Sequence, residues 1–190
     1  MQTESVTSGA QSTAQAEAWA IDASHSSVTF SVRHMMITNV RGEFQKLAGT
    51  VKYDAKRPEA AAVEVEIDVA SIQTREEKRD AHLRSADFFD VEKFPTIKFS
   101  AAGITGATKD GFELTGDLTI HGVTRKVTLE VEGPTAPSKD PWGNTRIGAT
   151  ATTKIKRSDF GMTWNNVLEA GGVLVGDEIK VSLDVSLVKQ

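Results

Sequence analysis

The side chains able to carry out acid–base or nucleophilic chemistry are few in this chain of 190 residues. The candidates are four histidines, three acids and one arginine: His25, His34, His82, His121, Asp80, Asp87, Asp159 and Arg79. Arg79 and His82 fall on one face of a predicted helix, with Asp80 next to them. A histidine oriented by a carboxylate can act as a general base and an arginine can hold an anion, so this group is the candidate for catalysis. An ion pair on the protein surface explains the same pattern.

The other three histidines have simpler interpretations. His25 stands in the turn-like stretch Asp22–Ser26 and is predicted to bond to the backbone there. His121 precedes Gly122 and is predicted to be a turn residue of a hairpin. His34 continues an apolar row of a predicted strand, so it either lines the interior with a hydrogen-bond partner or contacts a ligand.

No local motif for catalysis or metal binding stands in the sequence. The chain has no cysteine, which excludes disulfides, thiolate catalysis, zinc–cysteine sites and iron–sulfur clusters. No two histidines have the helical spacing of a metal site, and the phosphate-loop, dinucleotide-binding and nucleophile-elbow patterns do not occur. We therefore expect neither a metal nor a cofactor. A Ser-His-Asp arrangement need not be local in sequence, so an enzyme stays open as an alternative.

The composition is that of an ordinary globular protein. Hydrophobic residues make up 39% of the chain, charged residues 25%, and the formal net charge is -4. Lys and Arg are scattered among a slight excess of acids, so we expect no nucleic-acid partner. No segment approaches the roughly 18 consecutive apolar residues of a membrane-spanning helix. The length fits one domain with a sizeable core.

The first 17 residues differ from the rest of the chain. They are rich in Gln, Ser, Thr, Ala and Gly, so we expect residues 1–17 to be disordered and residues 18–190 to form the domain. A secretory signal has a basic start and an apolar stretch of about 7 to 15 residues, and this segment has neither. The sequence as written is thus expected to be cytoplasmic, or periplasmic if the native protein carries a signal that this sequence lacks.

From Trp19 onward, apolar residues recur at every second position, which predicts strands buried on one face. The clearest rows are Val28-Phe30-Val32-His34, Val63-Val65-Ile67-Val69, Phe112-Leu114, Leu118-Ile120, Val127-Leu129-Val131, Ile147-Ala149-Ala151-Ile155 and Ile179-Val181-Leu183-Val185-Leu187. Turn residues separate these rows at 109–111, 121–122, 133–134, 141–144 and 171–172. Roughly eight strands joined mainly by hairpins either stack as two sheets or close into a barrel, and the pattern leaves both open.

Two segments break the strand pattern. Thr74, with Glu77 three positions on, fits a capping box and predicts a helix that extends to about Ala86. Pro95 ends any helix before the next strand. The stretch Arg157–Asn166 is predicted to be irregular.

Read in order from Trp19 to Leu187, ten short motifs resemble the YceI-like polyisoprenoid-binding family. They are Trp19-Ala20-Ile21-Asp22, His25-Ser26, Phe30-Ser31-Val32-Arg33-His34-Met35, Gly42-Glu43-Phe44, Ile72-Gln73-Thr74, Arg79-Asp80-Ala81-His82-Leu83, Asp87-Phe88-Phe89-Asp90, Phe94-Pro95-Thr96-Ile97-Lys98-Phe99, the stretch from Gly116 to Thr124, and Arg157-Ser158-Asp159-Phe160-Gly161-Met162. The order of so many pieces makes the resemblance specific.

The resemblance implies an all-β fold, an extended eight-stranded antiparallel β-barrel of lipocalin-like design with one or two short helices. It implies a carrier or store for a long-chain amphiphile, an isoprenoid quinone or polyprenyl chain, that works without catalysis. It also implies a homodimer and, for most members, a periplasmic location.

We assign the ligand-binding residues of such a barrel in two groups. The apolar wall is predicted to include Phe30, Val32, Phe44, Ile72, Leu83, Phe88, Phe99, Leu118, Phe160, Met162 and Trp164. A polar head group near a mouth is predicted to meet His34, Arg79 and His82. Two alternatives remain: an enzyme acting on such a lipid with His34 or His82 as base, and an interaction module whose barrel is filled by its own side chains.

Overall fold

The protein is described here by a computed structural model that covers residues 16–54, 56–107 and 110–190. Within these ranges the strands are β1 (Glu17–Ile21), β2 (Ser27–His34), β3 (Thr38–Phe44), β4 (Leu47–Tyr53), β5 (Ala62–Asp68), β6 (Ile72–Gln73), β7 (Thr96–Ala102), β8 (Thr105–Ala107), β9 (Gly111–Ile120), β10 (Val123–Glu132), β11 (Ser138–Lys139), β12 (Thr145–Lys156) and β13 (Val175–Lys189). The helices are α1 (Glu77–Arg84) and four short 3-10 helices, η1 (Ala23–His25), η2 (Pro58–Ala60), η3 (Val69–Ser71) and η4 (Arg157–Phe160). None of these helices is long and apolar enough to cross a membrane.

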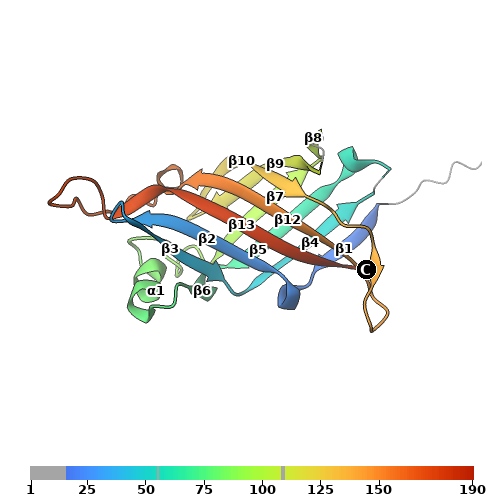
Figure 1. Cartoon of the computed structure of the whole chain (residues 1–190), viewed down its shortest axis with the longest axis horizontal. Helices are drawn as coiled ribbons and strands as arrows, with labels where there is room; N and C mark the ends of the chain where they lie inside the picture. Colours follow the sequence, from blue (N-terminus) through green and yellow to red (C-terminus); the bar gives the residue numbers. More distant parts are fainter. Residues whose placement is uncertain (1–15, 55, 108–109) are drawn as a thin grey trace, which may run out of the picture.

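Eight antiparallel strands close into a barrel. Their order around the ring is β12-β10-β9-β7-β5-β4-β1-β13, and β13 pairs back with β12 from Arg146↔Val188 to Lys156↔Glu178. The long β12 and β13 run side by side along the barrel, as Figure 1 shows. Closure leaves the ring without a free edge. The predicted eight-stranded, lipocalin-like barrel is confirmed, and the alternative of two stacked sheets is wrong.

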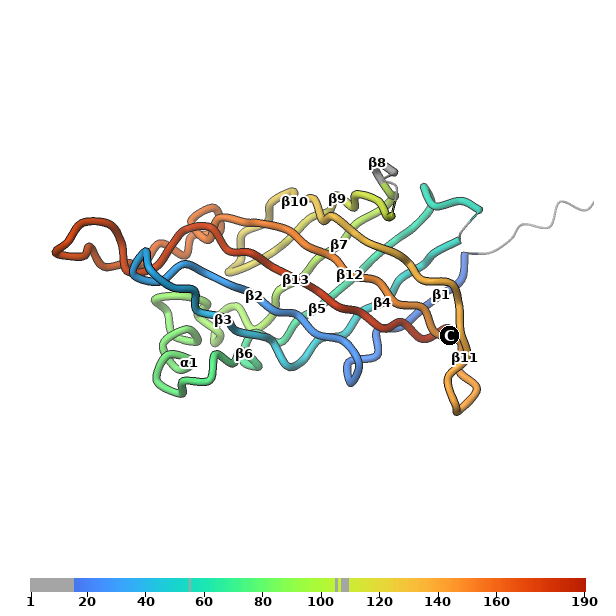
Figure 2. Tube along the Cα trace, viewed as in Figure 1, coloured from blue at the N-terminus to red at the C-terminus, as the bar shows by residue number. Residues whose placement is uncertain are grey.

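The barrel is elongated because β13 has two successive partners along its length. Its last residues pair with β1, and its residues 175–184 pair with β2. Asp22 makes this possible, since its carboxylate accepts a hydrogen bond from the Ser24 N–H (3.0 Å) and caps the 3-10 turn between the two strands. The β2–β3 hairpin therefore extends one half of the wall, and Figure 2 shows α1 beside it.

Helix α1 starts later than its sequence motif suggests. Glu76 is the N-cap, and its carboxylate accepts hydrogen bonds from the Lys78 and Arg79 N–H groups (3.2 and 2.6 Å). Thr74 is instead buried, and both its N–H and its hydroxyl donate to the Asp80 carboxylate. The predicted capping box at Thr74 is thus wrong, because a buried side chain of the helix takes the donors of that threonine.

The other local predictions have mixed outcomes. The 121–122 turn is confirmed, with positive φ angles of 51° at His121 and 73° at Gly122, as a two-residue hairpin between β9 and β10 requires. His25 bonds to the side chains of Asp22 and Ser24 rather than to backbone. Of the segment 1–17, residues 1–15 lie outside the described residues, whereas Glu17 belongs to β1. The turn at 109–111 lies partly outside them as well.

Arg146 on β12 links two turns at the barrel end opposite α1. Its guanidinium donates to the Asp22 carboxylate (2.6 Å) at the β1–β2 turn and to the Asp140 carboxylate (2.7 Å) in the β11–β12 hairpin. The hydrogen bond from Arg146 is the main reason that the pKa of Asp140 falls to about 2. Hydrogen bonds from Ser24, Arg146 and His25 hold the pKa of Asp22 well below its usual range.

These depressed carboxyl pKa values predict an acid-dependent stability. Both carboxylates stabilise the fold fully above the unfolded-state pKa, about 3.9, and this contribution is lost as the pH falls toward 2. We expect Arg146→Met to lower the urea midpoint at pH 7 and the difference from the wild type to shrink between pH 4 and 2. Lys139→Met, at an exposed cation on the neighbouring strand, is the control. A difference that stays constant across this pH range contradicts the assignment.

Candidate functional site

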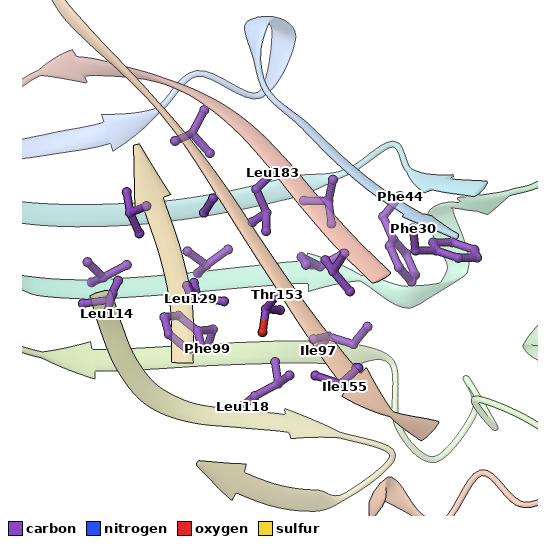
Figure 3. A pocket seen from close by; sticks show the side chains of 18 of the residues that line it. Phe30, Phe44, Ile97, Phe99, Leu114, Leu118, Leu129, Thr153, Ile155 and Leu183 are labelled. Atoms are coloured by element: carbon purple, nitrogen blue, oxygen red, sulfur yellow. The ribbon is translucent and has the colours of Figure 1, made fainter. Parts of the chain in front are cut away.

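The inward side chains of the barrel strands surround a tunnel. The cavity has a volume of about 260 Å³, and its wall extends from Leu83 and Phe88 at the α1 end to Tyr53 and Leu187 at the opposite end. Figure 3 shows Phe99, Leu118 and Leu183, from three different strands, directed toward the same interior space. Nearly all of the lining side chains are hydrocarbon. Apolar cavities of this kind stay dry and accept hydrocarbon in preference to water.

The interior is not filled by the side chains that face it. Phe30, Leu118 and Leu183 point into a closed barrel and yet are only partly buried. All three line the tunnel, and the outer side of the wall is formed by the alternate residues of each strand. An unfilled apolar interior argues against a barrel that serves only as an interaction module.

Three polar side chains belong to the wall: Tyr53, Thr153 and Arg157. The Thr153 hydroxyl donates to the Thr128 carbonyl (2.8 Å) and is satisfied within the sheet. The Arg157 side chain is 5% exposed, and its pKa is lowered by burial. Its guanidinium donates to the carbonyls of Met162, Trp164, Gly176 and Val175, at 2.7, 2.9, 2.9 and 3.3 Å. Arg157 therefore fixes η4 and the following loop against the start of β13.

Aromatic side chains line the α1 end of the tunnel. Phe44 on β3 packs against Phe30 and Phe89, with ring centroids 5.7 and 5.9 Å apart. Phe88 is in the wall, and Trp164 from the loop after η4 packs behind it at 5.2 Å. The α1 segment and the residues after it thus contribute Leu83, Phe88 and Phe89 to the wall at this end.

The structure places eight of the fourteen predicted ligand-binding residues in the cavity wall. They are Phe30, Val32, Phe44, Leu83, Phe88, Phe99, Leu118 and Met162. The other six do not line it: His34, Ile72, Arg79, His82, Phe160 and Trp164. Ile72 and Phe160 are fully buried in the core cluster around the α1 end. Whether a ligand touches the eight wall residues stays a prediction.

The polar group predicted around the helix is not assembled as an active site. Arg79 donates to the side chain and carbonyl oxygens of Thr74 (2.7 and 2.8 Å) and holds the loop before α1. His82 contacts Asp87 through Nε2 (2.8 Å), so the predicted orientation of His82 by Asp80 is wrong. Within the described ranges, no three His, Asp or Glu side chains gather closely enough to hold a metal ion.

Sequence reasoning missed Arg157 and the small residues of β12. Ala149 and Ala151 lie in the wall between larger neighbours and leave the tunnel open. The alternation in β12 predicted that Ala149 and Ala151 face inward, but not that their small size leaves room in the cavity. Arg157 stands in a stretch predicted only as irregular, and its run of carbonyl partners depends on a fold that brings residues 162–176 around it.

Comparisons with known proteins agree with this geometry. A family model described as a YceI-like domain matches residues 19–187. A UPF0312 protein of Azotobacter vinelandii is 38% identical over 138 residues, which cover 73% of this chain and 71% of that protein. A UPF0312 protein of Pseudomonas putida is 36% identical with the same coverage.

Solved structures share the fold. The YCEI protein of Campylobacter jejuni superposes with a TM-score of 0.69 at 29% identity, covering 83% of this chain and 90% of that one. Burkholderia cenocepacia BcnA gives a TM-score of 0.72 at 24% identity, covering 87% and 98%. A domain from Saccharophagus degradans, described as polyisoprenoid binding and implicated in plant cell wall breakdown, gives 0.66 at 16% identity, covering 92% and 99%.

The buried Arg157 predicts a large loss of stability on substitution. Arg157→Met keeps the volume but removes the guanidinium donor from the Met162, Trp164 and Gly176 carbonyls, whereas the Val175 carbonyl keeps its bond from the Asn165 amide. We expect this loss to cost about 3 kcal/mol or more of the free energy of unfolding. Hydrogen exchange should rise most in residues 161–176, which the guanidinium holds together. Arg125→Met, at an exposed arginine of β10, is the matched control. Equal, small losses in the two variants would show that the hydrogen bonds of Arg157 contribute little to the free energy of unfolding.

Proposed function

Because this chain belongs to the YceI-like family, we propose that it binds a long-chain amphiphilic lipid, such as an isoprenoid quinone or polyprenyl chain, in its tunnel. It carries or stores that lipid without changing it chemically. The observation that carries the proposal is the closed apolar wall whose inward side chains stay partly exposed to the cavity. The description of the Saccharophagus degradans domain as polyisoprenoid binding supports the same choice of ligand.

Hydrocarbon burial alone supplies the affinity in this proposal. Each buried methylene contributes about 0.8 kcal/mol, so a chain of a few isoprene units gains several kcal/mol on leaving water. Of the three polar side chains in the wall, Arg157 and Thr153 donate to backbone carbonyls of the protein. They are therefore not needed as partners of a head group, and selection acts mainly on the length and width of the apolar chain.

An enzymatic role is not favoured by any contact in the site. The candidate base His82 contacts Asp87 outside the cavity wall, and Arg79 is occupied by Thr74. A lipid held in the tunnel would meet mainly hydrocarbon side chains. Binding is the role that this lining can perform.

Filling the tunnel should weaken lipid binding without unfolding the barrel. Ala149 faces the cavity in the middle of β12, and Ala149→Phe places a ring where ligand carbons would lie. Displacing two methylenes already costs about 1.6 kcal/mol, so we expect at least a tenfold weaker affinity for a long-chain prenyl quinone. Thr152→Phe, on the outer face of the same strand, should bind like the wild type.

The assay combines equilibrium binding of the quinone with native mass spectrometry and organic extraction of the purified proteins. We expect long-chain lipid in the wild type and in Thr152→Phe, and much less in Ala149→Phe. A wild-type protein that yields no lipid and also binds no prenyl lipid, quinone or fatty acid overturns the proposed function.

A further inference from the structure

Four large apolar side chains project into solvent at one end of the barrel. Met35, Met36 and Ile37, in the β2–β3 turn, are 42%, 53% and 74% exposed, and Val167 in the loop after η4 is 85% exposed. We call these four residues the apolar tip. The turn and the loop are joined, because the Met35 N–H donates to the Leu174 carbonyl (2.8 Å). Figure 1 shows both at the barrel end that carries α1.

The backbone of the turn holds the two methionines outward at a conformational cost. Met35 and Met36 have positive φ angles of 50° and 61°, and the Ile37 N–H donates to the His34 carbonyl (3.2 Å) to close the turn. Glycine and asparagine are the usual residues at such positions, and other residues lose about 1–2 kcal/mol each there. Methionine at these two positions therefore stabilises the fold neither through burial nor through a favourable backbone conformation.

The apolar tip adjoins the end of the tunnel. Val32 and Val175 line the cavity, and Val175 is the register partner of His34, the residue before Met35. A surface that binds the apolar tip would therefore lie next to the tunnel end formed by Val32 and Val175.

The positive charge of the β2–β3 hairpin favours a negatively charged partner. The stretch Ser27–Gly42 contains Arg33, His34 and Arg41 and no acidic residue. The exposed Arg33 reaches the turn itself, where its Nε donates to the Met36 carbonyl (3.2 Å). The neighbouring loop, residues 161–174, adds one acid, Glu169. Apolar side chains flanked by arginines fit the interface of an anionic bilayer.

The size of the apolar tip also favours a bilayer over a protein partner. A stable protein interface buries about 800 Å² on each partner, more than four projecting side chains offer. A bilayer needs no such area, because each large apolar side chain that enters it contributes about 1.5–3 kcal/mol when fully buried. Four such residues give reversible attachment.

We propose that the apolar tip docks the barrel end-on onto an anionic lipid bilayer, with the tunnel end at Val32 and Val175 facing the acyl chains. The inference rests on the proposed lipid carriage and adds the site at which lipid enters and leaves. Docking and lipid binding are separate measurements, so either can fail alone.

The test compares a double variant of the tip, Met36→Asp with Ile37→Asp, with Trp142→Asp at the opposite end, where Trp142 is 78% exposed. Asp tolerates positive φ and should not disturb the turn. Full-length proteins are floated with phosphatidylcholine vesicles that contain about 30 mol% phosphatidylglycerol, because anionic head groups attract basic segments. We expect at least tenfold less of the double variant in the vesicle fraction and no change for Trp142→Asp.

A second assay separates docking from binding. Prenyl quinone supplied from detergent solution should bind the double variant as it binds the wild type, whereas extraction of quinone from the vesicles should slow at least tenfold. Wild-type protein that binds quinone but does not float overturns the docking proposal and leaves the carrier function intact. Loss of flotation in Trp142→Asp alone also overturns the docking proposal. So does a double variant that floats like the wild type, whether or not its oligomeric state changes. A protein that binds no quinone at all contradicts the carrier function instead.

Discussion

Pairing of β12 with β13 is the interaction on which the rest of the structure depends. It closes the sheet, removes the free edges and turns one face of every strand toward a common axis. The inner row of β12 includes Ala149 and Ala151, and that of β13 includes Val181 and Leu183. These short side chains line a cavity together with residues of the other strands, so the closed ring encloses a tunnel. The volume open to a ligand therefore depends on side-chain size at wall positions such as Ala149 and Ala151.

Two arginines hold the ends of this tunnel. Arg146 joins the β1–β2 turn to the β11–β12 hairpin through two carboxylates, and Arg157 gathers carbonyls of the loop between η4 and β13. Both guanidinium groups donate their hydrogen bonds to oxygen atoms of the protein itself. The charged groups therefore shape the tunnel and leave the contact surface to hydrocarbon. The same division explains why the polar residues around α1 sit outside the wall, where His82 pairs with Asp87 and Arg79 with Thr74.

The sequence predicted the strands well because alternation is a local property. Val181, Leu183 and Val185 all face the tunnel, as their period of two indicates. Ile72 and Phe160 stand outside these alternating rows, and no local pattern indicated that they lie in the core rather than in the cavity wall. Closure of the ring was implied by the family resemblance and not by the pattern, which suits a sandwich equally well.

Features set by three-dimensional contacts rather than by a repeating sequence pattern could not be predicted. Thr74 resembles an N-cap until the fold brings Asp80 back to its N–H. The positive φ angles of Met35 and Met36 arise from the register of β2 with β3, which leaves a short turn whatever residues fill it. Arg157 acquires its role only when residues from 162 to 176 surround it.

A crystal structure of the protein incubated with a long-chain lipid brominated near the middle of its chain tests the tunnel most directly. The account predicts continuous density along the barrel axis, with an anomalous bromine peak between Leu118 and Leu183. An axis occupied by the protein's own side chains, with bromine only on the outer surface, would contradict it.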